Sequence, residues 1–418
     1  MAETVAILVG GGPAPGINGV ISAATIRCLD EGRKVLGIEQ GFKWIMQGDV
    51  SKITPLTIDQ VSRLHFRGGS ILKTARANPT RNSAHVTQVL KSLEQLGVTG
   101  LITIGGDDTC FSALTLERAA QGRLRVVHVP KTIDNDLDLP RGVPTFGFQT
   151  ARHLGTYAVQ SILEDARTTS HWFFVVAMGR KAGHLALGIG NAAGATLTLI
   201  PEEFPERPVR LAKVADILAG AMIKRLSQGH EDGVAVLAEG LAEIMDPDDL
   251  TALASVARDD HGHPALADLD LGRVLKEEVL KRLKPYGITP IIRLKDLGFE
   301  LRCADPIPFD MEYCRELGAC AAEFLIGGGS GAMVSIVNGE FSPMPFNTIL
   351  DPLTQRTRVR MVDVTAGTYR IARRHMIRLE PGDFEQSERL TRCAAVVGLA
   401  AETFRERFAS VVAHDQTT

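Results

Sequence analysis

The sequence predicts an α/β protein in which helices cover two separate parallel sheets. Short apolar runs alternate along the chain with longer amphipathic stretches, and this is the pattern of βαβ units. The second half of the chain repeats the alternation without repeating the residues of the first half. We therefore expect two Rossmann-like, three-layer α/β/α domains rather than one large sheet.

The short apolar runs are predicted strands because turn residues bound them and β-branched residues are frequent in them. They are Val5–Val9, Lys34–Ile38, Leu101–Ile104, Arg125–Val129, Trp172–Ala177, Gly233–Leu237, Thr289–Leu294 and Ala332–Val337. The amphipathic stretches are predicted helices. They include Ile17–Glu31, Ala84–Leu96, Phe111–Gln121, Thr150–Thr168, Arg207–Gln228 and Tyr313–Ile326. The segment 246–285 is predicted to be a helical insertion on the surface, and the tail from Glu380 a single helix that frays after Ala413.

Composition excludes several classes of protein. The chain has 418 residues and a formal net charge of −3, so its overall charge favours neither nucleic acid nor a membrane surface as a partner. Its six cysteines include no Cys-x-x-Cys pair, which is typical of free thiols in a reducing compartment. The chain starts directly with a strand, and no apolar run approaches the ~18 residues that span a bilayer. We therefore expect a soluble, cytoplasmic protein.

His261 and His263 form a possible metal pair within the predicted insertion. No third ligand lies near them in the sequence, and the surrounding residues are typical of a loop. A solvated turn is therefore favoured over a metal site.

Two short stretches that follow predicted strands carry most of the chemistry: Gly105–Thr109 and Pro130–Asp136. They place four carboxylates, a lysine and glycine-bent backbone at strand ends, where open α/β sheets bind ligands. Carboxylates hold Mg²⁺, and one can also remove the proton of an attacking hydroxyl group, while a lysine and backbone N–H groups hold phosphate. The combination predicts phosphoryl transfer onto an alcohol.

Further loops at strand ends carry groups that bind anions or sugars. Gly10–Asn18 lets backbone N–H groups approach an anion at a helix start, although plain strand-to-helix packing also explains such glycines. Arg76 and Arg180 stand in glycine-framed loops and suit phosphate oxygens, with a surface ion pair as the alternative for Arg76. Glu239 follows a predicted strand and suits sugar hydroxyl groups, with helix capping as the alternative.

Taken in order, these motifs resemble the phosphofructokinase family from Val5 to about Ile336. The resemblance is carried by Gly-Gly-Asp at 105–107, Thr-Ile-Asp-Asn-Asp at 132–136, Met-Gly-Arg at 178–180 and Pro-Ile-Pro-Phe-Asp at 306–310. NAD kinases and lipid kinases share the first element, but the second excludes them. The resemblance implies a donor domain, residues 1–148 with about 300–360, and a sugar-phosphate domain, residues 149–299 with about 361–418. It places the active site in the cleft between these domains.

The resemblance also implies a role for each matching residue. Asp134 would be the base that takes the proton of the 1-hydroxyl group of fructose 6-phosphate, with Thr132 and Arg180 beside the transferring phosphoryl group. Asp107 and Asp136 would hold Mg²⁺. The implied donor-binding residues are Gly11, Gly12, Arg76, Asp108 and Lys131. The implied substrate-binding residues are Thr132, Asp134, Asp136, Met178, Gly179, Arg180, Glu239, Arg293 and Arg302.

Asp108 and Lys131 determine which phosphoryl donor is expected. Family members that use ATP have glycine at both places, whereas this Asp/Lys pair resembles the diphosphate-dependent members. Two like charges ~4 Å apart repel by about 1 kcal/mol in water and about 4 kcal/mol at an effective dielectric constant near 20, so Asp108 disfavours an α-phosphate. Lys131 supplies a compact cation for a short, highly charged donor. The predicted reaction is transfer from diphosphate to fructose 6-phosphate, giving fructose 1,6-bisphosphate and phosphate.

Three alternatives are compatible with the sequence. One is an ATP-dependent phosphofructokinase that tolerates Asp108. Another is an enzyme that also accepts a different sugar phosphate, since the sugar pocket is defined only by Glu239 and arginines. The third is a regulatory subunit without activity, but such a subunit is expected to lose catalytic residues, and Asp107, Asp134 and Arg180 are all present.

Some positions depart from the pattern of the bacterial ATP-using members. His171 stands about where those enzymes have an arginine contributed across a subunit interface. Ser22 and Ile26 stand where regulated members place effector-binding arginines, so we expect little response to ADP or phosphoenolpyruvate. The resemblance also implies that Arg293 or Arg302 reaches a neighbouring subunit, so a homodimer or homotetramer is expected.

Overall fold

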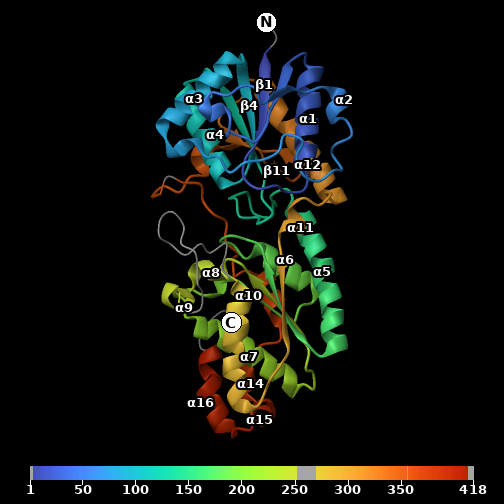
Figure 1. Cartoon of the computed structure of the whole chain (residues 1–418), viewed down its shortest axis with the longest axis vertical. Coiled ribbons are helices and arrows are strands. Elements are labelled where there is room, and N and C mark those ends of the chain that lie inside the picture. The colour runs from blue at the N-terminus through green and yellow to red at the C-terminus, as the bar shows by residue number, and fades with distance from the viewer. Residues whose placement is uncertain (1–2, 252–269, 355, 413–418) are drawn as a thin grey trace. The chain divides into compact units, whose positions relative to one another are not determined.

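The computed structural model describes residues 3–251, 270–354 and 356–412 (Figure 1). The chain forms two compact units. Unit 1 consists of Met1–Ala151 with Phe299–Arg360, and unit 2 consists of Arg152–Gly298 with Met361–Thr418. His261 and His263 lie outside the described residues.

Unit 1 is built on a seven-stranded sheet with the order β13-β10-β5-β4-β1-β2-β3. Its strands are β1 (Thr4–Val9), β2 (Lys34–Ile38), β3 (Ile53–Pro55), β4 (Val98–Gly105), β5 (Arg125–Pro130), β10 (Ala332–Met333) and β13 (Met344–Pro345). The edge strands β3 and β13 are antiparallel to their neighbours, and the other pairs are parallel. The register pairs Val9 with Ile104 and Ile104 with Val129. The carboxyl ends of β1, β4 and β5 therefore meet at one edge, where open parallel sheets bind ligands.

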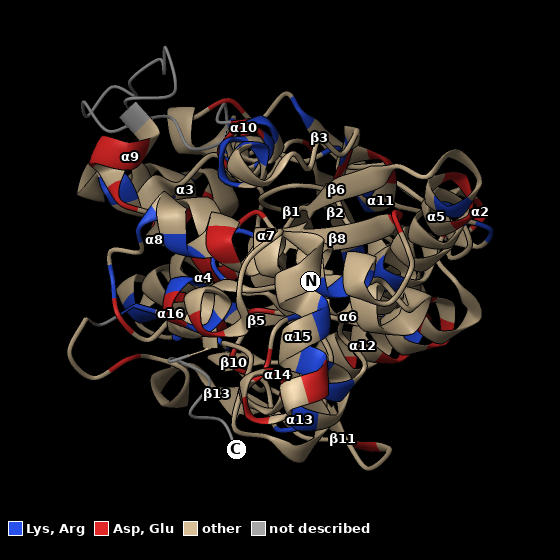
Figure 2. Ribbon diagram, turned by 90° about the horizontal axis from the view of Figure 1, so that it is seen from below, with Lys and Arg blue, Asp and Glu red and all other residues tan. Residues whose placement is uncertain are grey.

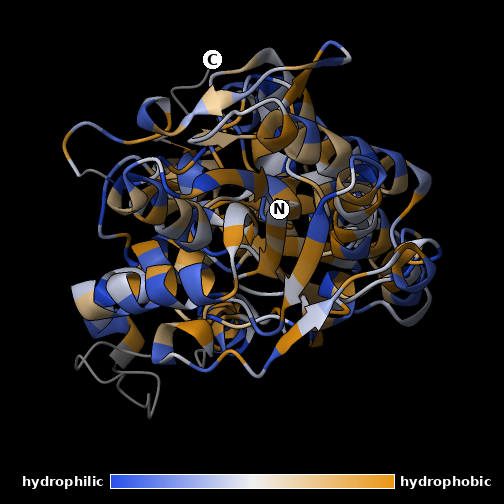
Figure 3. Cartoon of the chain, turned by 90° about the horizontal axis from the view of Figure 1, so that it is seen from above, coloured by the Kyte–Doolittle hydropathy of each residue, from blue (hydrophilic) through white to orange (hydrophobic). Residues whose placement is uncertain are grey.

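Helices cover both faces of this sheet, with α1 and α12 on one face and α3 and α4 on the other (Figure 1). The helices of unit 1 are α1 (Ile17–Asp30), α2 (Ile58–Val61), α3 (Ser83–Gln95), α4 (Asp107–Ala120), α11 (Phe299–Arg302) and α12 (Pro308–Ile326), with short 3₁₀ turns at Ile45–Gln47, Pro79–Arg81 and Phe346–Thr348. Successive residues of β1 point to opposite faces, so Val5 and Ile7 join the core under α1 while Ala6 and Leu8 join the core under α3. Figure 3 shows these apolar strands between helices whose outward sides are polar.

Unit 2 contains a four-stranded parallel sheet with the order β7-β8-β6-β9. Its strands are β6 (Trp172–Ala177), β7 (Leu197–Leu199), β8 (Gly233–Ala238) and β9 (Ile292–Leu297). Two further strands, β11 (Ile336–Val337) and β12 (Glu340–Phe341), form a separate antiparallel ladder in unit 1. The parallel sheet of unit 2 and the mostly parallel sheet of unit 1 confirm the predicted α/β class.

The core of unit 2 lies between this sheet and a group of helices that includes the C-terminal ones. The helices of unit 2 as a whole are α5 (Phe148–Thr169), which begins in unit 1, α6 (His184–Ala193), α7 (Leu211–Ser227), α8 (Leu241–Ile244), α9 (Pro247–Thr251), α10 (Leu271–Leu283), α13 (Gly367–Arg374), α14 (Pro381–Glu385), α15 (Ser387–Val396) and α16 (Ala401–Val412), with 3₁₀ turns η3 (Pro201–Glu203) and Lys284–Tyr286. Trp172 and Phe174 of β6 pack with residues of α7 and α10 in this core. On α6, Gly190 allows close approach to the sheet, because an added Cβ would lie 2.0 Å from Thr198 Oγ1.

Three of the predicted strands are wrong in their bounds. The predicted strand Leu101–Ile104 starts three residues late, because β4 begins at Val98. The predicted strand Ala332–Val337 is two short strands, β10 and β11, that belong to different sheets. The predicted strand Thr289–Leu294 lies too close to the N-terminus, because β9 spans Ile292–Leu297. β9 is an edge strand whose central residues are exposed. The charged residues Lys295 and Asp296 interrupt the apolar run on which the prediction relied.

The segments predicted as an insertion and as a tail also differ from expectation. α10 is not a surface insertion, because Leu271, Leu275 and Val279 are buried in the core of unit 2. The tail is not one helix but three, α14, α15 and α16. The glycine Gly398, at a φ of +65°, follows the end of α15 and turns the chain, and Phe404 of α16 then stacks on Phe384 of α14.

No helix in the described residues is long and apolar enough to cross a membrane. Lysine and arginine residues are interspersed with aspartate and glutamate residues over the helices, as Figure 2 shows. This mixture agrees with the small net charge of −3.

Candidate active site

Asp107, predicted to bind the metal, and Asp108, predicted to select the donor, both lie on the first turn of α4, because β4 ends at Gly105 and the helix begins at Asp107. The sequence predicted this helix from Phe111, one turn later. Carboxylates are stable in a first helical turn because the helix dipole is positive there. The early start therefore fixes both carboxylates to a rigid element rather than to a loop.

Thr109, a residue that sequence reasoning did not select, fills the space between the first glycine loop and the Gly-Gly-Asp turn. A Cβ added to Gly10 would lie 2.3 Å from Thr109 Oγ1, and one added to Gly105 would lie 2.4 Å from the same atom. The backbone of Gly11 donates to the carbonyl oxygen of Ala75 at 2.9 Å, which brings Arg76 beside the first loop. The glycines are therefore required by close packing of three loops.

Lys131 points back from the end of β5 into the first glycine loop. Its side chain is only 4% exposed, and its ammonium group donates to the carbonyl oxygen of Gly12. A Cβ on Gly11 would lie 3.3 Å from Lys131 Nζ, and one on Gly12 would lie 3.1 Å from Arg302 Nη1. The side chains of Lys131 and Arg302 therefore lie next to Gly11 and Gly12, the two glycines that were predicted to bind the donor.

The charges around Lys131 shift its pKa. Burial lowers the pKa of Lys131 from 10.5 to about 8, and the nearby carboxylate of Asp134 opposes this shift. Arg302 and Arg76 lower the pKa further, while Asp136 raises it. The predicted residues Arg76, Lys131, Asp134, Asp136 and Arg302 are therefore close enough in unit 1 to act on one another electrostatically.

The segment that carries Arg302 is held against the loop that leads to Arg76. The backbone N–H of Gly68 donates to Asp305 Oδ1 at 2.8 Å, and a Cβ on Gly68 would lie 2.2 Å from the carbonyl oxygen of Cys303. The guanidinium of Arg302 lies 4.6 Å from the centroid of the Phe299 ring, and its Nε is buried without a hydrogen-bond partner among the described residues. Arg302 therefore has capacity for a bound anion.

The loop from Thr132 to Asp136 is tightly braced. The backbone N–H of Asp134 donates to Thr132 Oγ1 at 3.0 Å, and the Asp134 side chain is 8% exposed. Asn135 has a φ of +56°, a strained region that asparagine tolerates better than most residues. Arg360, which sequence reasoning missed, donates to the carbonyl oxygens of Asn135 at 3.1 Å and Val143 at 2.8 Å. Its contribution is long-range, so no local motif could have identified it.

His128 supports the Gly-Gly-Asp turn from inside the sheet, and it was also missed. Its Nδ1 lies 2.8 Å from Thr103 Oγ1 and its Nε2 lies 3.0 Å from the carbonyl oxygen of Gly105. Burial lowers the pKa of His128 to about 3, so the ring is neutral and Nε2–H can donate to Gly105. The same carbonyl oxygen accepts the backbone N–H of Lys131 at 2.8 Å. One buried acceptor thus fixes both motifs relative to each other.

In unit 2, Met178, Gly179, Arg180 and Glu239 come together at the carboxyl ends of β6 and β8. The backbone N–H of Gly179 donates to Glu239 Oε2 at 3.2 Å, so the Glu239 carboxylate holds the loop that carries Arg180. A Cβ on Gly240 would lie 2.7 Å from the carbonyl oxygen of Arg180. The arginine side chain is exposed.

Two other charged residues complete the picture of unit 2. Arg293 is exposed on the edge strand β9. Glu243, which sequence reasoning missed, lies close enough to Arg180 and Lys181 to interact with them: desolvation raises the pKa of Glu243, and the two cations oppose that shift. The sequence around Glu243 contains no motif that would have marked this residue as part of a functional site.

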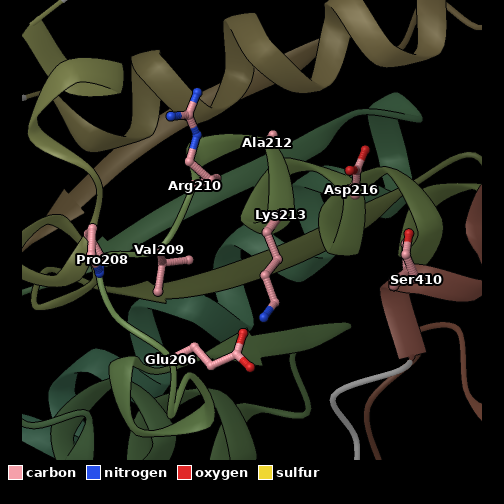
Figure 4. A pocket seen from close by; sticks show the side chains of 9 residues that line it. Glu206, Pro208, Val209, Arg210, Ala212, Lys213, Asp216 and Ser410 are labelled. Atoms are coloured by element: carbon pink, nitrogen blue, oxygen red, sulfur yellow. The ribbon is translucent and has the colours of Figure 1, made fainter.

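Two pockets in the described part of the chain lie apart from these residues. One, of about 330 Å³ in unit 2, is bordered by α7 and α16 (Figure 4); its lining includes Glu206, Arg210, Lys213, Asp216 and Ser410. Arg210 is neutralised there by Asp246 and Asp249, at 3.4 and 2.8 Å. The other, of about 760 Å³ in unit 1, lies along α1 and α12 and includes Ser22 and Ile26. No predicted catalytic, donor-binding, substrate-binding or metal residue lines either pocket.

The family profile described as phosphofructokinase matches residues 4–325. The chain belongs to the phosphofructokinase family. Pyrophosphate–fructose 6-phosphate 1-phosphotransferases of Thermotoga maritima and Naegleria fowleri are each 48% identical to it, over 98% of this chain and over 98% and 96% of those proteins. The ATP-dependent 6-phosphofructokinase 1 of Thermus thermophilus is 32% identical, over 84% of this chain and 94% of that protein.

Among solved structures, the pyrophosphate-dependent phosphofructokinase from Marinobacter aquaeolei superimposes with a TM-score of 0.67. The alignment covers 94% of this chain and 91% of that one at 15% sequence identity. At this identity the likeness shows the fold alone, and the predicted fold class is confirmed. The predicted family is confirmed by the profile and by the relatives at 48% identity.

Proposed function

We propose that this enzyme transfers a phosphoryl group from diphosphate to the 1-hydroxyl group of fructose 6-phosphate, giving fructose 1,6-bisphosphate and phosphate, reversibly, in glycolysis and gluconeogenesis. The observation that carries the proposal is the buried Lys131 side chain, which contacts the first glycine loop next to Arg302. Asp108 stands on the first turn of α4. Relatives of nearly the same length that carry the diphosphate-dependent name support the same donor.

On the donor side, cations and backbone N–H groups would hold diphosphate. The N–H group of Gly12, together with Lys131 and Arg76, would donate to the diphosphate. The N–H of Gly11 is already bonded to Ala75, so Gly11 would contribute by leaving no side chain between the anion and Lys131. Asp108 would exclude the α-phosphate and ribose of ATP by its charge and its volume. Diphosphate has neither an α-phosphate nor a ribose, so the Asp108 carboxylate would weaken its binding less than that of ATP.

Asp107 and Asp136 are proposed to hold Mg²⁺. The described residues contain no group of three or more histidine, cysteine, aspartate or glutamate side chains that could enclose a metal ion. Mg²⁺ commonly takes only one or two carboxylates and fills its other positions with phosphate oxygens and water, so a two-carboxylate site fits it. When bound, it supplies neutralisation of the charge on the diphosphate oxygens.

On the acceptor side, Asp134 is proposed to take the proton of the 1-hydroxyl group. The hydroxyl oxygen then forms a bond to the nearer phosphorus, the bond from that phosphorus to the bridging oxygen breaks, and phosphate leaves with both electrons. Thr132 and Arg180 would lie beside the transferring group, where a hydroxyl and a guanidinium stabilise its developing charge. The buried position of Asp134 keeps bulk water away from the proton that it receives.

The sugar phosphate is proposed to be held by residues that supply a carboxylate for its hydroxyl groups and guanidinium groups for its phosphate. Met178, Gly179 and Glu239 would contact the sugar, and Arg293 and Arg302 its 6-phosphate. Asp136 and the catalytic residues named above would complete the substrate-binding set. The unpartnered Nε of Arg302 supports this assignment, because a buried guanidinium nitrogen needs an acceptor.

A homodimer or homotetramer is proposed because β9 is an edge strand with exposed apolar side chains. Leu294 on this strand is 39% exposed, and Ile291 just before it is 51% exposed. Exposed edge strands are commonly covered by another chain, and Arg293 lies on the same strand. A charged replacement, Leu294→Glu, is expected to shift the protein to a smaller species in size-exclusion chromatography with light scattering. An unchanged mass would contradict an interface at β9.

The cytoplasm is the proposed compartment. All six cysteines are free in the structure, and burial raises the pKa of Cys28 and Cys320 to about 11. Buried, protonated thiols without disulfide partners are typical of proteins in a reducing environment.

The decisive experiment compares the two donors on the purified protein with Mg²⁺ and fructose 6-phosphate. We expect turnover with diphosphate and at least about a hundredfold less with ATP, as several kcal/mol of discrimination would give. The matched control is Asp108→Gly with Lys131→Gly, which restores the two glycines of the ATP-using pattern and should lose most of the diphosphate activity. Robust turnover with ATP and none with diphosphate would overturn the proposal.

A further inference from the structure

A single carboxylate oxygen supports the loop that carries Arg180. Glu202, in the turn η3 after β7, accepts the backbone N–H of Gly183 at 2.9 Å with its Oε1. The same oxygen accepts the backbone N–H of Val362, also at 2.9 Å. Its Oε2 is buried and has no hydrogen-bond partner among the described residues. Glu202 therefore joins the end of the Arg180 loop to the start of the C-terminal segment.

The adjacent residue fastens a later part of the same C-terminal segment to the same turn. Glu203 Oε2 lies 2.6 Å from Arg378 Nη1, and the two side chains are only 8% and 7% exposed. The backbone N–H of Ile377 donates to the carbonyl oxygen of Thr196 at 2.7 Å. Separating a buried ion pair leaves buried charges without partners, which is strongly unfavourable. The pair between Glu203 and Arg378 therefore resists displacement of the C-terminal segment.

The turn and the Arg180 loop are in direct contact, with no room for a side chain between them. A Cβ added to Gly183 would lie 2.4 Å from Ile200 Cβ and 2.8 Å from Glu202 Oε2. Close-packed groups transmit displacements rather than absorb them. A shift of η3 or of residue 362 would therefore move the loop.

We propose that Glu202 is a positioning residue through which the C-terminal segment Met361–Arg378 sets the place of Arg180. This segment lies outside residues 4–325, which the family profile matches, so it would be an addition that supports a site shared by the family. The inference rests on the proposed function, in which Arg180 stabilises the transferring phosphoryl group. A displacement of about 1 Å at such a group can cost about a hundredfold in rate.

The chemistry of Glu202 suggests a conservative replacement. Burial raises the pKa of Glu202, and its hydrogen bonds to the backbone of Gly183 and Val362 oppose the shift. Because burial disfavours the charged form of Glu202, an uncharged side chain of the same shape, glutamine, should be tolerated at this position. In Glu202→Gln, one amide oxygen can still accept both backbone N–H groups.

The test measures kcat, and KM for fructose 6-phosphate, in Glu202→Ala, Glu202→Gln and Gly183→Ala. Glu202→Ala removes the acceptor and Gly183→Ala pushes the loop off the turn, so in each we expect kcat/KM to fall at least about tenfold. Glu202→Gln should stay within about threefold of the natural enzyme, because the two acceptor contacts survive. Glu380→Gln is the matched control, since Glu380 pairs with Arg373 in the C-terminal segment and does not touch the Arg180 loop.

A second readout makes the test independent of activity. Hydrogen exchange of peptides covering residues 178–187 and 360–365 should be faster in Glu202→Ala and unchanged in Glu380→Gln. If the natural protein lacks activity with diphosphate, the proposed function fails, but the exchange measurement still tests the role of Glu202. Unchanged exchange in Glu202→Ala, kcat/KM within twofold of the natural enzyme, or an equal loss in Glu380→Gln would each overturn the inference.

Discussion

Unit 1 and unit 2 hold their functional loops at the same place in the fold, the carboxyl ends of parallel strands, but by different means. In unit 1 the loops around Asp107 and Lys131 pack directly on one another: Thr109 fills the space beside two glycines, and Lys131 lies against Gly12. A carboxylate, that of Asp305, accepts a backbone N–H in the neighbouring loop, at Gly68. In unit 2 the loop with Arg180 is held by carboxylates that accept backbone N–H groups, Glu239 at one end and Glu202 at the other.

This difference follows from what each half is proposed to bind. A diphosphate ion is small and highly charged, so a rigid nest of cations and N–H groups can be complete before it binds. A sugar phosphate has hydroxyl groups as well as charge, and carboxylates such as Glu239 can bind a hydroxyl and a loop at once. Loops held by packing should therefore respond to changes in volume and charge, and loops held by carboxylates to the loss of an acceptor.

The largest effect should come from the proposed base in unit 1. Replacing Asp134 by asparagine removes the proton acceptor and keeps the shape, so kcat should fall by about 10²–10⁴-fold with little change in KM. Steady-state kinetics with diphosphate and fructose 6-phosphate measure both. An unchanged kcat would remove Asp134 from this role and leave unit 1 as a binding site only.

A smaller effect is expected from the cation behind the glycine loop. Lys131→Met removes the charge and leaves an apolar chain of similar volume, so KM for diphosphate should rise by about a hundredfold, as the loss of a desolvated charged contact implies. KM for fructose 6-phosphate should change much less. Equal increases in KM for diphosphate and KM for fructose 6-phosphate would show that Lys131 does not contribute specifically to binding of the donor.

The pH dependence should show the same residue titrating. With a pKa of about 8 in the free enzyme, Lys131 loses its proton as the pH rises through 8, and the neutral amine binds phosphate poorly. We therefore expect kcat/KM for diphosphate to fall above about pH 8, by up to about tenfold per pH unit. Lys131→Arg stays charged over this range, so its profile should keep only the titration of the donor itself. Identical profiles would contradict the assignment.

The smallest effect is expected where unit 2 depends on an acceptor. Glu239→Gln keeps an oxygen that can accept the N–H of Gly179, so KM for fructose 6-phosphate should rise by only about three- to tenfold. Glu239→Ala, which keeps no acceptor, should exceed it. If the two variants are equal, the carboxylate does not hold the loop, and the contrast between the units is wrong.

The motifs that predicted the family and the fold are local, and the sequence therefore contained them. Gly-Gly-Asp and Thr-Ile-Asp-Asn-Asp each follow an apolar strand, and the parallel register of β4 and β5 brings those strand ends together. The alternation of strands and helices predicted two parallel sheets. Two are observed, but the sheet of unit 1 also carries two antiparallel edge strands, β3 and β13, that were not predicted. The early start of α4 was missed because its first turn is acidic and polar rather than amphipathic.

What the sequence could not predict depends on contacts between distant residues. Arg360 lies 225 residues from Asn135, whose backbone it supports, and Glu202 lies 160 residues from Val362. Such partners leave no spacing pattern. The three C-terminal helices were merged into one prediction because amphipathic periodicity continues across Gly398. The contact that folds α16 back on α14, between Phe404 and Phe384, is tertiary and leaves no local pattern.

The exposed thiol next to Arg302 gives the molecule a natural attachment point. Cys303 is exposed, whereas burial raises the pKa of the thiols of Cys28, Cys110, Cys314, Cys320 and Cys393. Alkylating reagents react with the thiolate form, so a fluorescent maleimide should modify Cys303 first. A dye there, one residue from a guanidinium proposed to bind phosphate, would report ligand binding by its emission without any engineered cysteine.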